Sequence, residues 1–448
     1  MAVWSEIFIK DIEQHRVDAE YYQPKYLFAS KLVGNKKLKK YGVMVQHPAE
    51  TRRIYADSGI QIVLAQNNRN NFYDWSEKRY MPNHMKVTLV RNHLEYGDVT
   101  VTRSGANYGQ TSVITIEEKN NLYACADLLI IKTSEIAGPL LSTYFNTKIG
   151  KDLMERGVYG AGQPHVAPAY IKEIAFPQQL LSINEEIERI IVNARNYSER
   201  AQSLHTQSQE LLERELGLDK LVFDKPLSYE AKVSDVVGKL RGDAEFHNPM
   251  LKAYYRHLSK KHKLGKITEY LKVLKFGNPI YSRKGIPIIT QKHLQDITPA
   301  SYGADLLADK SWVQKYPLAI LKKNDLLFYS VGAYLGKTNI WLNEDKAVHA
   351  SFITMLRCQE EIDSGYLMAL LNSKYGLLQS KVFQSGTSQQ YIYPKDIRQF
   401  LVPKIAYSLK VKLYDLIINS QKAKVKSQQL LEQAKRQVED LIEKAVEK

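Results

Sequence analysis

The sequence is poor in the residues and runs that typify secreted, membrane or metal-binding proteins. Only two cysteines occur among 448 residues, Cys125 and Cys358, which indicates reduced thiols and not a disulfide framework. The 11 histidines show no spacing typical of a metal site. No apolar run approaches the ~18 residues needed to span a bilayer, and the N-terminus lacks a basic segment followed by an apolar one. We therefore expect a soluble, cytoplasmic protein without a membrane partner.

Motifs of catalysis are lacking as well. The Asn-Pro string at 248–249 lacks the second proline and the aromatic residue that an adenine methyltransferase needs. Residues 336–338 read Gly-Lys-Thr, the end of a phosphate-binding loop, but Val331 stands where the first glycine should be. A Glu-Glu-Lys string at 117–119 has no Pro-Asp pair upstream of it. These absences favour a chain that is not an enzyme and that holds no metal.

Positive charge is the strongest bias of the composition. Lysine and arginine number 63 against 48 acidic residues, which gives a formal net charge of +15 and a pI near 9.3. This excess favours a polyanionic partner, nucleic acid first and an anionic membrane surface second. The alternative is a basic protein that is merely soluble. With 44% hydrophobic and 25% charged residues, the chain can bury real cores.

The second half of the chain repeats the first. The string RVDAEYYQPKY, beginning at Arg16, returns as RGDAEFHNPML, beginning at Arg241. Chance would not preserve both order and spacing, so we infer two diverged copies of a unit of about 226 residues. The other landmarks are Gly59 with Gly285, SGANYGQT at 104–111 with VGAYLGKT at 331–338, YFNTKIG at 144–150 with LLNSKYG at 370–376, and Pro168, Ile171 and Pro177 with Pro394, Ile397 and Pro403.

A strand-rich region is expected between helical regions in each copy. In the first copy a helix should begin at Pro24. A helix over 140–156, a glycine-rich loop and a strand ending at Pro177 should close that copy. The second copy should repeat this order, with its strands within about 266–357 and a helix around 366–379. Short β-branched runs predict strands of the first copy at 60–64, 86–90, 98–102, 112–116 and 128–131.

Two further segments have the pattern of long amphipathic helices. Between 183 and 216 apolar residues recur at spacings of three and four, and no glycine or proline occurs before Gly217. This helix would be roughly 50 Å long. A second one should follow Pro403. Pairing as an antiparallel coiled coil is the simplest way to bury both seams; the alternative is that each helix packs on its own domain.

The fold class that follows is α+β, with two tandem strand-rich domains, each followed by a long helix. The helices are predicted to pair as an antiparallel coiled coil. The predicted boundaries are 1–182 for the first domain, 183–218 for the central long helix, 219–405 for the second domain and 406–448 for the C-terminal long helix.

Loops rich in hydrogen-bond donors fall at corresponding positions of the two copies. Arginine and lysine suit guanine edges in the major groove, and asparagine and glutamine suit adenine edges. The loop side chains differ between copies while the glycine, proline and apolar landmarks agree, as expected for two readers of different sequences on one scaffold. For any single residue, an ordinary exposed loop position is the alternative. The candidates in the first copy are Arg52, Arg53, Gln66, Asn67, Asn68, Arg69, Asn70, Arg103, Asn107, Tyr108, Gln163 and His165. Those in the second are Asn278, Tyr281, Ser282, Arg283, Lys284, Gln291, Lys292, His293, Tyr334, Lys337, Ser388, Gln389 and Gln390.

In this doubled order the whole chain resembles the specificity subunits of type I restriction–modification systems. The resemblance is carried by the Asp-Ala-Glu-aromatic starts at 18–21 and 243–246, the Gly-Ala-x-x-Gly-x-Thr loops at 105–111 and 332–338, and the long helix after each closing proline. It implies two target recognition domains, each of which reads one half of a bipartite, asymmetric site in double-stranded DNA. It also implies two methyltransferase subunits as partners, with motor–nuclease subunits in the full complex. AdoMet, ATP and Mg²⁺ would belong to those partners, and this chain would hold no cofactor.

One loop departs between the copies. Residues 162–167 and 388–393 share only Gln163 and Gln389, so contacts in this loop cannot be carried from one copy to the other. Two rival interpretations stay open at this point. The chain could be a coiled-coil scaffold whose domains bind protein, or a self-contained DNA methyltransferase or nuclease with a cryptic site.

Overall fold

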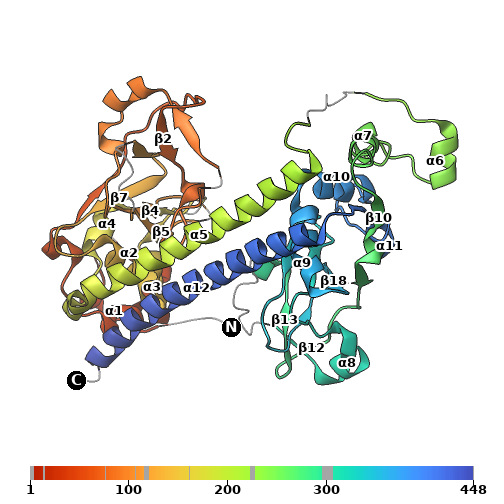
Figure 1. The fold of residues 1–448 in the computed structure, drawn as a ribbon. Helices are drawn as coiled ribbons and strands as arrows, with labels where there is room; N and C mark the ends of the chain where they lie inside the picture. Colours follow the sequence, from red (N-terminus) through yellow and green to blue (C-terminus); the bar gives the residue numbers. More distant parts are fainter. Residues whose placement is uncertain are drawn as a thin grey trace. The chain divides into compact units, whose positions relative to one another are not determined.

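The computed structural model describes residues 5–13, 16–75, 77–105, 107–115, 121–160, 162–221, 228–294 and 306–446. It divides into two compact units (Figure 1). Unit 1 comprises Met1–Asn196 together with Ser427–Lys448, and unit 2 comprises Tyr197–Lys426. Each of the two long helices therefore contributes one part to each unit.

Unit 1 is built on a four-stranded antiparallel sheet in the order β1-β7-β4-β5. Alternate residues of a strand point to opposite faces, and this sheet is covered on both. Leu129 and Ile131 of β7 enter the core under the helices, while Leu128 and Ile130 enter a second core. The strands are β1 (Met44–Gln46), β4 (Val99–Thr102), β5 (Thr111–Val113) and β7 (Leu128–Lys132).

The second core of unit 1 belongs to a smaller sheet in the order β3-β2-β6, in which β2 and β6 run parallel. A short hairpin, β8 and β9, lies outside both sheets. These strands are β2 (Ile60–Val63), β3 (Arg79–Met81), β6 (Leu122–Ala124), β8 (Val158–Tyr159) and β9 (His165–Val166). The helices of the unit, besides the long pair, are α1 (Pro24–Leu32), α2 (Gly138–Asn146), α3 (Lys148–Arg156) and α4 (Pro168–Glu173).

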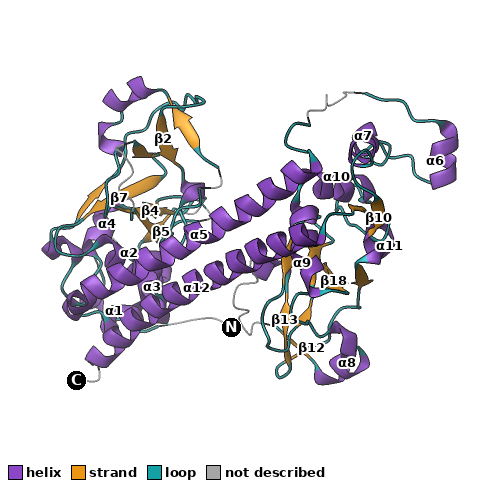
Figure 2. Ribbon diagram, viewed as in Figure 1, coloured by secondary structure: helices purple, strands orange, loops and turns teal. Residues whose placement is uncertain are grey.

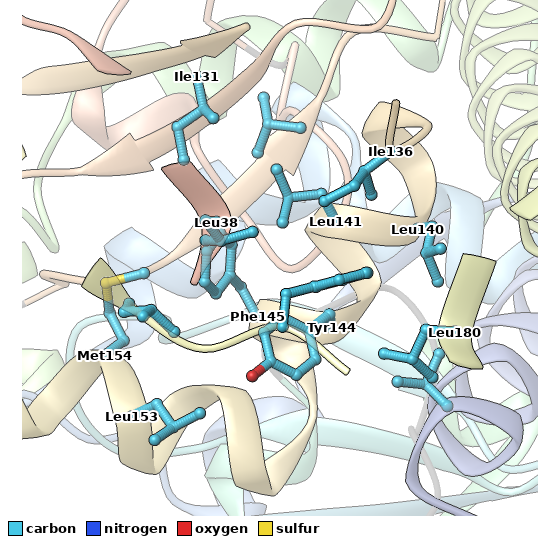
Figure 3. Close-up of a cluster of buried hydrophobic side chains, with 14 of the residues drawn as sticks. Leu38, Ile131, Ile136, Leu140, Leu141, Tyr144, Phe145, Leu153, Met154 and Leu180 are labelled. Atoms are coloured by element: carbon cyan, nitrogen blue, oxygen red, sulfur yellow. The ribbon is translucent and has the colours of Figure 1, made fainter. Parts of the chain in front are cut away.

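The main core of unit 1 joins the sheet to helices α2 and α3. Figure 3 shows Leu141 and Phe145 of α2 in one cluster with Ile131 of β7, and Leu153 of α3 at the lower edge of the view. Leu141 is fully buried and Phe145 nearly so, and full burial of such a side chain stabilises a fold by about 1.5–3 kcal/mol. The apolar runs of the sequence are thereby accounted for by packing.

Unit 2 has the same main sheet. Strand β11 pairs with β18, β18 with β15 and β15 with β16, all antiparallel, as β1, β7, β4 and β5 do in unit 1. The structure thus confirms the internal repeat. These strands are β11 (Leu271–Leu274), β15 (Leu326–Tyr329), β16 (Thr338–Ile340) and β18 (Ile353–Cys358).

The remainder of unit 2 is a second sheet in the order β12-β14-β13-β17, a two-stranded sheet of β10 and β19, and short helices. The second sheet has four strands where that of unit 1 has three, so the copies diverge most here. The strands are β10 (Leu264–Lys266), β12 (Tyr281–Ser282), β13 (Ile286–Ile289), β14 (Leu307–Ala308), β17 (Val348–His349) and β19 (Leu401–Pro403). The helices are α6 (Val233–Lys239), α7 (Pro249–Leu258), α8 (Lys310–Lys315), α9 (Glu361–Asn372), α10 (Lys374–Phe383) and α11 (Pro394–Ile397).

The long helices α5 (Asn184–Leu216) and α12 (Tyr407–Val446) pack against each other (Figure 2). In unit 1 the Ser427 hydroxyl donates to the Ala194 carbonyl at 2.6 Å. In unit 2 the Ser420 hydroxyl donates to the Ala201 carbonyl at 2.7 Å. Residue numbers rise along α5 as they fall along α12, so the pair is antiparallel, as predicted. Small residues one heptad apart allow these close contacts.

Four local predictions were wrong. The single helix expected around 366–379 is two helices, α9 and α10, because the Ser373 hydroxyl accepts a hydrogen bond from the Gly376 N–H and so caps the second one. Residues 86–90 form no strand, because Met85 and Leu89 are buried four residues apart while the valines between and after them face solvent; the segment contains two 3₁₀ turns. The helix over 140–156 breaks in two, because the Thr147 hydroxyl accepts a hydrogen bond from the Gly150 N–H and so caps a new helix. The segment before Pro177 makes only an isolated bridge and no strand. Ile116, in the predicted strand 112–116, lies outside the described residues.

Candidate nucleic-acid interface

The loops predicted to read DNA gather largely at one end of the main sheet. In unit 1, His47 directly follows β1, Arg103 directly follows β4, and Asp127 directly precedes β7. Because neighbouring strands are antiparallel, these three positions lie at the same end. We call this the loop end. In unit 2 the corresponding end carries Lys275 and Ser330.

Two glycines shape the Gly-Ala-x-x-Gly loop at this end of each sheet. Gly105 and Gly109 have φ of 88° and 76°, and Gly332 and Gly336 have 94° and 89°, a region that other residues rarely adopt. A Cβ added to Gly336 would lie 2.6 Å from the Cβ of Ser380 on α10. The repeated glycines are therefore explained by backbone geometry, and the residues between them are left to vary.

The loop before α4 (residues 162–167) or α11 (residues 388–393), which we call the Gly/Gln loop, lies beside the Gly-Ala loop in both units. In unit 1, Ser104 forms a bridge with His165, and the Val166 N–H donates to the Arg103 carbonyl at 3.0 Å. In unit 2, Val331 forms a bridge with Tyr391. Two loops that are about 60 residues apart in the chain thus form one surface in each unit, and their backbone bonds are equivalent while their exposed side chains differ.

A polar and basic group surrounds this surface in unit 1. One Arg103 guanidinium nitrogen lies 3.1 Å from His47 Nε2, and the backbone N–H of Arg103 donates to the Asp127 carbonyl. Arg53 forms an ion pair with Asp127 at 2.5 Å. His47 and Asp127 were not among the predicted residues, although Asp127 directly precedes the β-branched run at 128–131. Arg53 and Arg103 thus bring two guanidinium groups to the loop end, with Asp127 and His47 as their partners.

Asn67 and Asn68 are buried, in contrast to the prediction that they face DNA. The Asn67 side chain accepts a hydrogen bond from the Leu64 N–H and donates to the Asp74 carbonyl, both at 2.9 Å. The Asn68 amide donates to the Gln110 carbonyl at 2.6 Å. A side chain with these internal partners has no donor left for a base edge, so we assign both residues to holding their loop.

The remaining candidates fall into two groups by exposure. Half-buried side chains are those of Arg103, Tyr108, His165, Ser282 and Gln291, and His293 is buried. The exposed side chains are those of Arg52, Arg53, Gln66, Arg69, Asn70, Asn107 and Gln163 in unit 1, and of Asn278, Tyr281, Arg283, Lys284, Lys292, Tyr334, Lys337, Ser388, Gln389 and Gln390 in unit 2.

In unit 2 the Gln291 turn joins the loop surface. The Gln291 side-chain amide donates to the Val331 carbonyl at 2.6 Å, so this residue positions the neighbouring loop. Tyr334 stays 48% exposed, with the Lys337 ammonium 4.8 Å from its ring centre. An exposed aromatic ring and a lysine on one tight loop can contact a base or a sugar–phosphate backbone.

The segment from Asn278 to Lys284 contains β12 and belongs to the second sheet of unit 2. Tyr281 pairs with Ala308 of β14 and is 61% exposed. Among the described residues, no hydrogen bond joins this segment to the Gly-Ala loop. The structure therefore does not bring it together with Tyr334 and Gln389.

Lys275, which sequence reasoning missed, lies directly beyond β11 at the loop end. Its ammonium group donates to Ser330 Oγ at 2.9 Å, to the Ile353 carbonyl at 3.1 Å and to Thr354 Oγ1 at 3.3 Å. Burial without a neighbouring carboxylate lowers the pKa of Lys275 to about 8. All three donors are used inside the protein, so Lys275 holds the ends of β15 and β18 and adds charge beneath the loops.

The repeated motif that begins at Arg16 and Arg241 holds backbone carbonyl groups in both units. Arg16 pairs with Asp18 at 2.7 Å and donates to two carbonyl groups at and just beyond the end of α3. Arg241 pairs with Asp243 at 2.8 Å and donates to two carbonyl groups at the end of α10. In both units the arginine ties the segment before α1 or α7 to the helix, α3 or α10, that leads into the Gly/Gln loop.

No cluster of three or more His, Cys, Asp or Glu side chains that could hold a metal ion occurs within the ranges that the structure describes. In those same ranges, no helix is both long and apolar enough to cross a membrane.

Comparison with known proteins finds similarity in structure only. No protein-family model matches the sequence, and no curated protein does. The type I restriction–modification S subunit from M. genitalium is similar with a TM-score of 0.42 and 12% identity, over 91% of this chain and 94% of that one. The HsdS subunit from Thermoanaerobacter tengcongensis has a TM-score of 0.29 and 12% identity, over 90% and 96%. A chain from a study of complex assembly and conformational transition in a type I system has a TM-score of 0.30 and 13% identity, over 93% and 96%. All TM-scores are below 0.5, so we base the functional proposal on the chain's own residues.

Proposed function

We propose that this chain is a non-catalytic DNA-reading subunit of the type I restriction–modification kind, in which each unit reads one half of a bipartite, asymmetric site. One observation carries the proposal. The same two loops lie side by side at the same end of the same sheet in both units, and the exposed side chains on them differ. Two units that recognise different half-sites require the same scaffold with different side chains on its loops.

The side chains at the loop end are suited to base and phosphate contacts. In unit 1 we assign base contacts to Asn107 and Gln163 and backbone contacts to Arg53 and Arg103, because amide groups suit adenine edges and arginines suit guanine or phosphate. In unit 2 Tyr334, Lys337, Ser388 and Gln389 take these roles. The net charge of +15 supplies the sequence-independent part of the affinity.

The paired helices set the distance between the half-sites in this proposal. Two readers that meet one groove about one helical turn apart are separated by roughly 34–36 Å. A helix of 33 residues measures about 50 Å, which is long enough to span such a separation. We expect the number of unread base pairs to follow the length of the pair.

Chemistry is assigned to partners. In this proposal two methyltransferase subunits supply AdoMet-dependent methylation, and motor–nuclease subunits supply ATP- and Mg²⁺-dependent cleavage, in the cytoplasm. The chain itself chooses the DNA sequence. An AdoMet-binding signal or metal-dependent cleavage by the isolated chain would favour a self-contained enzyme instead.

The test is a DNA-selection experiment at about 150 mM salt on the chain co-expressed with a type I methyltransferase subunit from the same genome. Recovery of one gapped, asymmetric motif supports the proposal and gives both half-sites. Recovery of random DNA, or of none, would favour a protein-binding scaffold. Gln389→Ala should alter only one half of the motif, and Gln163→Ala only the other.

A further inference from the structure

The first half of helix α12 is strongly basic. Residues 407–426 contain five lysines and one acidic residue, Asp415. The second half, 427–446, carries bases and acids in nearly equal number, and α5 carries more acids than bases. The excess positive charge is therefore confined to one stretch of the helix, which ends near its middle.

Three of these lysines lie on the solvent face of the helix. Lys412, Lys422 and Lys426 are ten and four residues apart and are exposed. Asp415 and Asn419 are exposed at the same periodicity between Lys412 and Lys422, so the stretch with Lys422 and Lys426 is the part of this face without an acidic residue. The opposite face of this stretch is buried, through Leu413, Ile417 and Ser420. The lysines thus take no part in the packing of the helix pair.

The exposed lysines have no acidic partner, in contrast to a lysine nearby. Lys410 forms an ion pair with Asp363 at 2.7 Å and is mostly buried. Among the described residues, no carboxylate lies within ion-pair distance of Lys412, Lys422 or Lys426. Their charge is therefore available to a ligand from outside the chain.

We propose that this lysine face of α12 binds the phosphate backbone of the unread spacer between the two half-sites; the inference rests on the proposed function. A duplex read at two places is not read between them, so contacts there need charge and not base-edge geometry. Lysine is a flexible point charge, suited to phosphates, whereas base reading favours the forked guanidinium of arginine.

The dimensions of the face agree with such a contact. Four residues separate Lys422 from Lys426, a rise of about 6 Å, and fourteen separate Lys412 from Lys426, about 21 Å. At 3.4 Å per base pair, 21 Å corresponds to about six base pairs. An acidic protein surface is the alternative ligand. It is less favoured because lysine is depleted in protein–protein interfaces.

The test compares the Lys422→Gln/Lys426→Gln double variant with the unchanged chain, each assembled with the methyltransferase subunit. Neutralising two phosphate contacts should lower the slope of log K against log salt by about 2, since each contact contributes about 0.9. Affinity should fall equally for all spacer sequences of one length, and the selected half-sites should stay the same. Lys260→Gln/Lys261→Gln is the control, because it removes two exposed lysines of the same unit from the loop before β10. An equal slope change in this control would show a general charge effect and overturn the proposal.

Uncharged methylphosphonates in the spacer identify the contact itself. They should weaken binding by the unchanged chain and have much less effect on the double variant. An unaltered slope in the double variant would refute the inference. If the double variant also assembles more weakly with the methyltransferase subunit, the ligand of these lysines is an acidic protein surface. These outcomes for the double variant do not bear on the proposed function. The proposed function fails only if the complex with the unchanged chain selects no bipartite motif.

Discussion

The substitution Asn68→Ala separates a structural asparagine from a DNA-reading one. The Asn68 side chain has 0% exposure. Its amide donates to the Gln110 carbonyl at 2.6 Å and to Thr102 Oγ1 at 3.1 Å, and its oxygen accepts from Thr100 Oγ1 at 3.1 Å. Truncation removes three hydrogen bonds. The Gln110 carbonyl keeps the Thr102 N–H at 2.8 Å and the Thr100 hydroxyl keeps the Tyr73 hydroxyl at 2.7 Å, so the Thr102 hydroxyl is the group that loses its partner. At about 1–3 kcal/mol for the unsatisfied hydroxyl and about 0.5–1.5 kcal/mol for each of the other two lost bonds, we expect unit 1 to lose about 2–5 kcal/mol.

Urea and thermal unfolding of the full chain measure this loss. For a unit of about 200 residues, it corresponds to a fall of roughly 5–15 °C in the Tm of the unit 1 transition. Asn70→Ala is the matched control, because Asn70 is exposed two residues along the same loop. It should change stability by no more than about 0.5 kcal/mol. The reasoning is refuted if Asn68→Ala leaves stability unchanged and alters the selected motif.

Three further predictions concern the loop end. Gly336→Ala should destabilise unit 2 by about 2–4 kcal/mol in urea unfolding, because it combines a strained φ with a clash against Ser380. Gly332→Ala, where a new Cβ meets nothing within 4 Å, should cost about 1–2 kcal/mol; equal losses would contradict the close approach. The pKa of Lys275 is lowered to about 8, so the unfolded chain binds more protons between pH 8 and about 10.5 and this group adds stability as pH rises. The stability of the unchanged chain relative to Lys275→Met should therefore increase from pH 7.5 to pH 10, and a constant difference would count against it. Arg103→Ala should reduce affinity about equally for all DNA sequences and lower the slope of log K against log salt by about 1 in DNA titrations; relaxed selection at the first half-site would show that Arg103 reads a base and disprove its assignment to the DNA backbone.

Long-period features of the fold could be predicted from the sequence. The repeat at Arg16 and Arg241 and the seams of α5 and α12 depend on patterns that many residues share, so single exceptions do not obscure them. Short elements were less predictable. The run at 86–90 has valines like a strand, but its buried residues, Met85 and Leu89, follow helical spacing.

The candidate site could be predicted as a set of loops but not as a set of side chains. The glycine landmarks located the Gly-Ala and Gly/Gln loops, and the structure places them together. The sequence does not distinguish Asn68 from Asn70, since both are asparagines in one polar run. It also gave no reason to include His47, which reaches Arg103 from a strand 56 residues away.

The sequence by itself therefore determined the duplication, the α+β class and the antiparallel helix pair, because periodicity and repeated order are properties of the chain. Only the tertiary structure decided which donors are free to meet DNA. The partners of Asn68 lie 32 to 42 residues away in the chain, and Gln291 donates to a carbonyl 40 residues away. A hydrogen bond between distant segments depends on how the strands bring them together, and no local pattern records it.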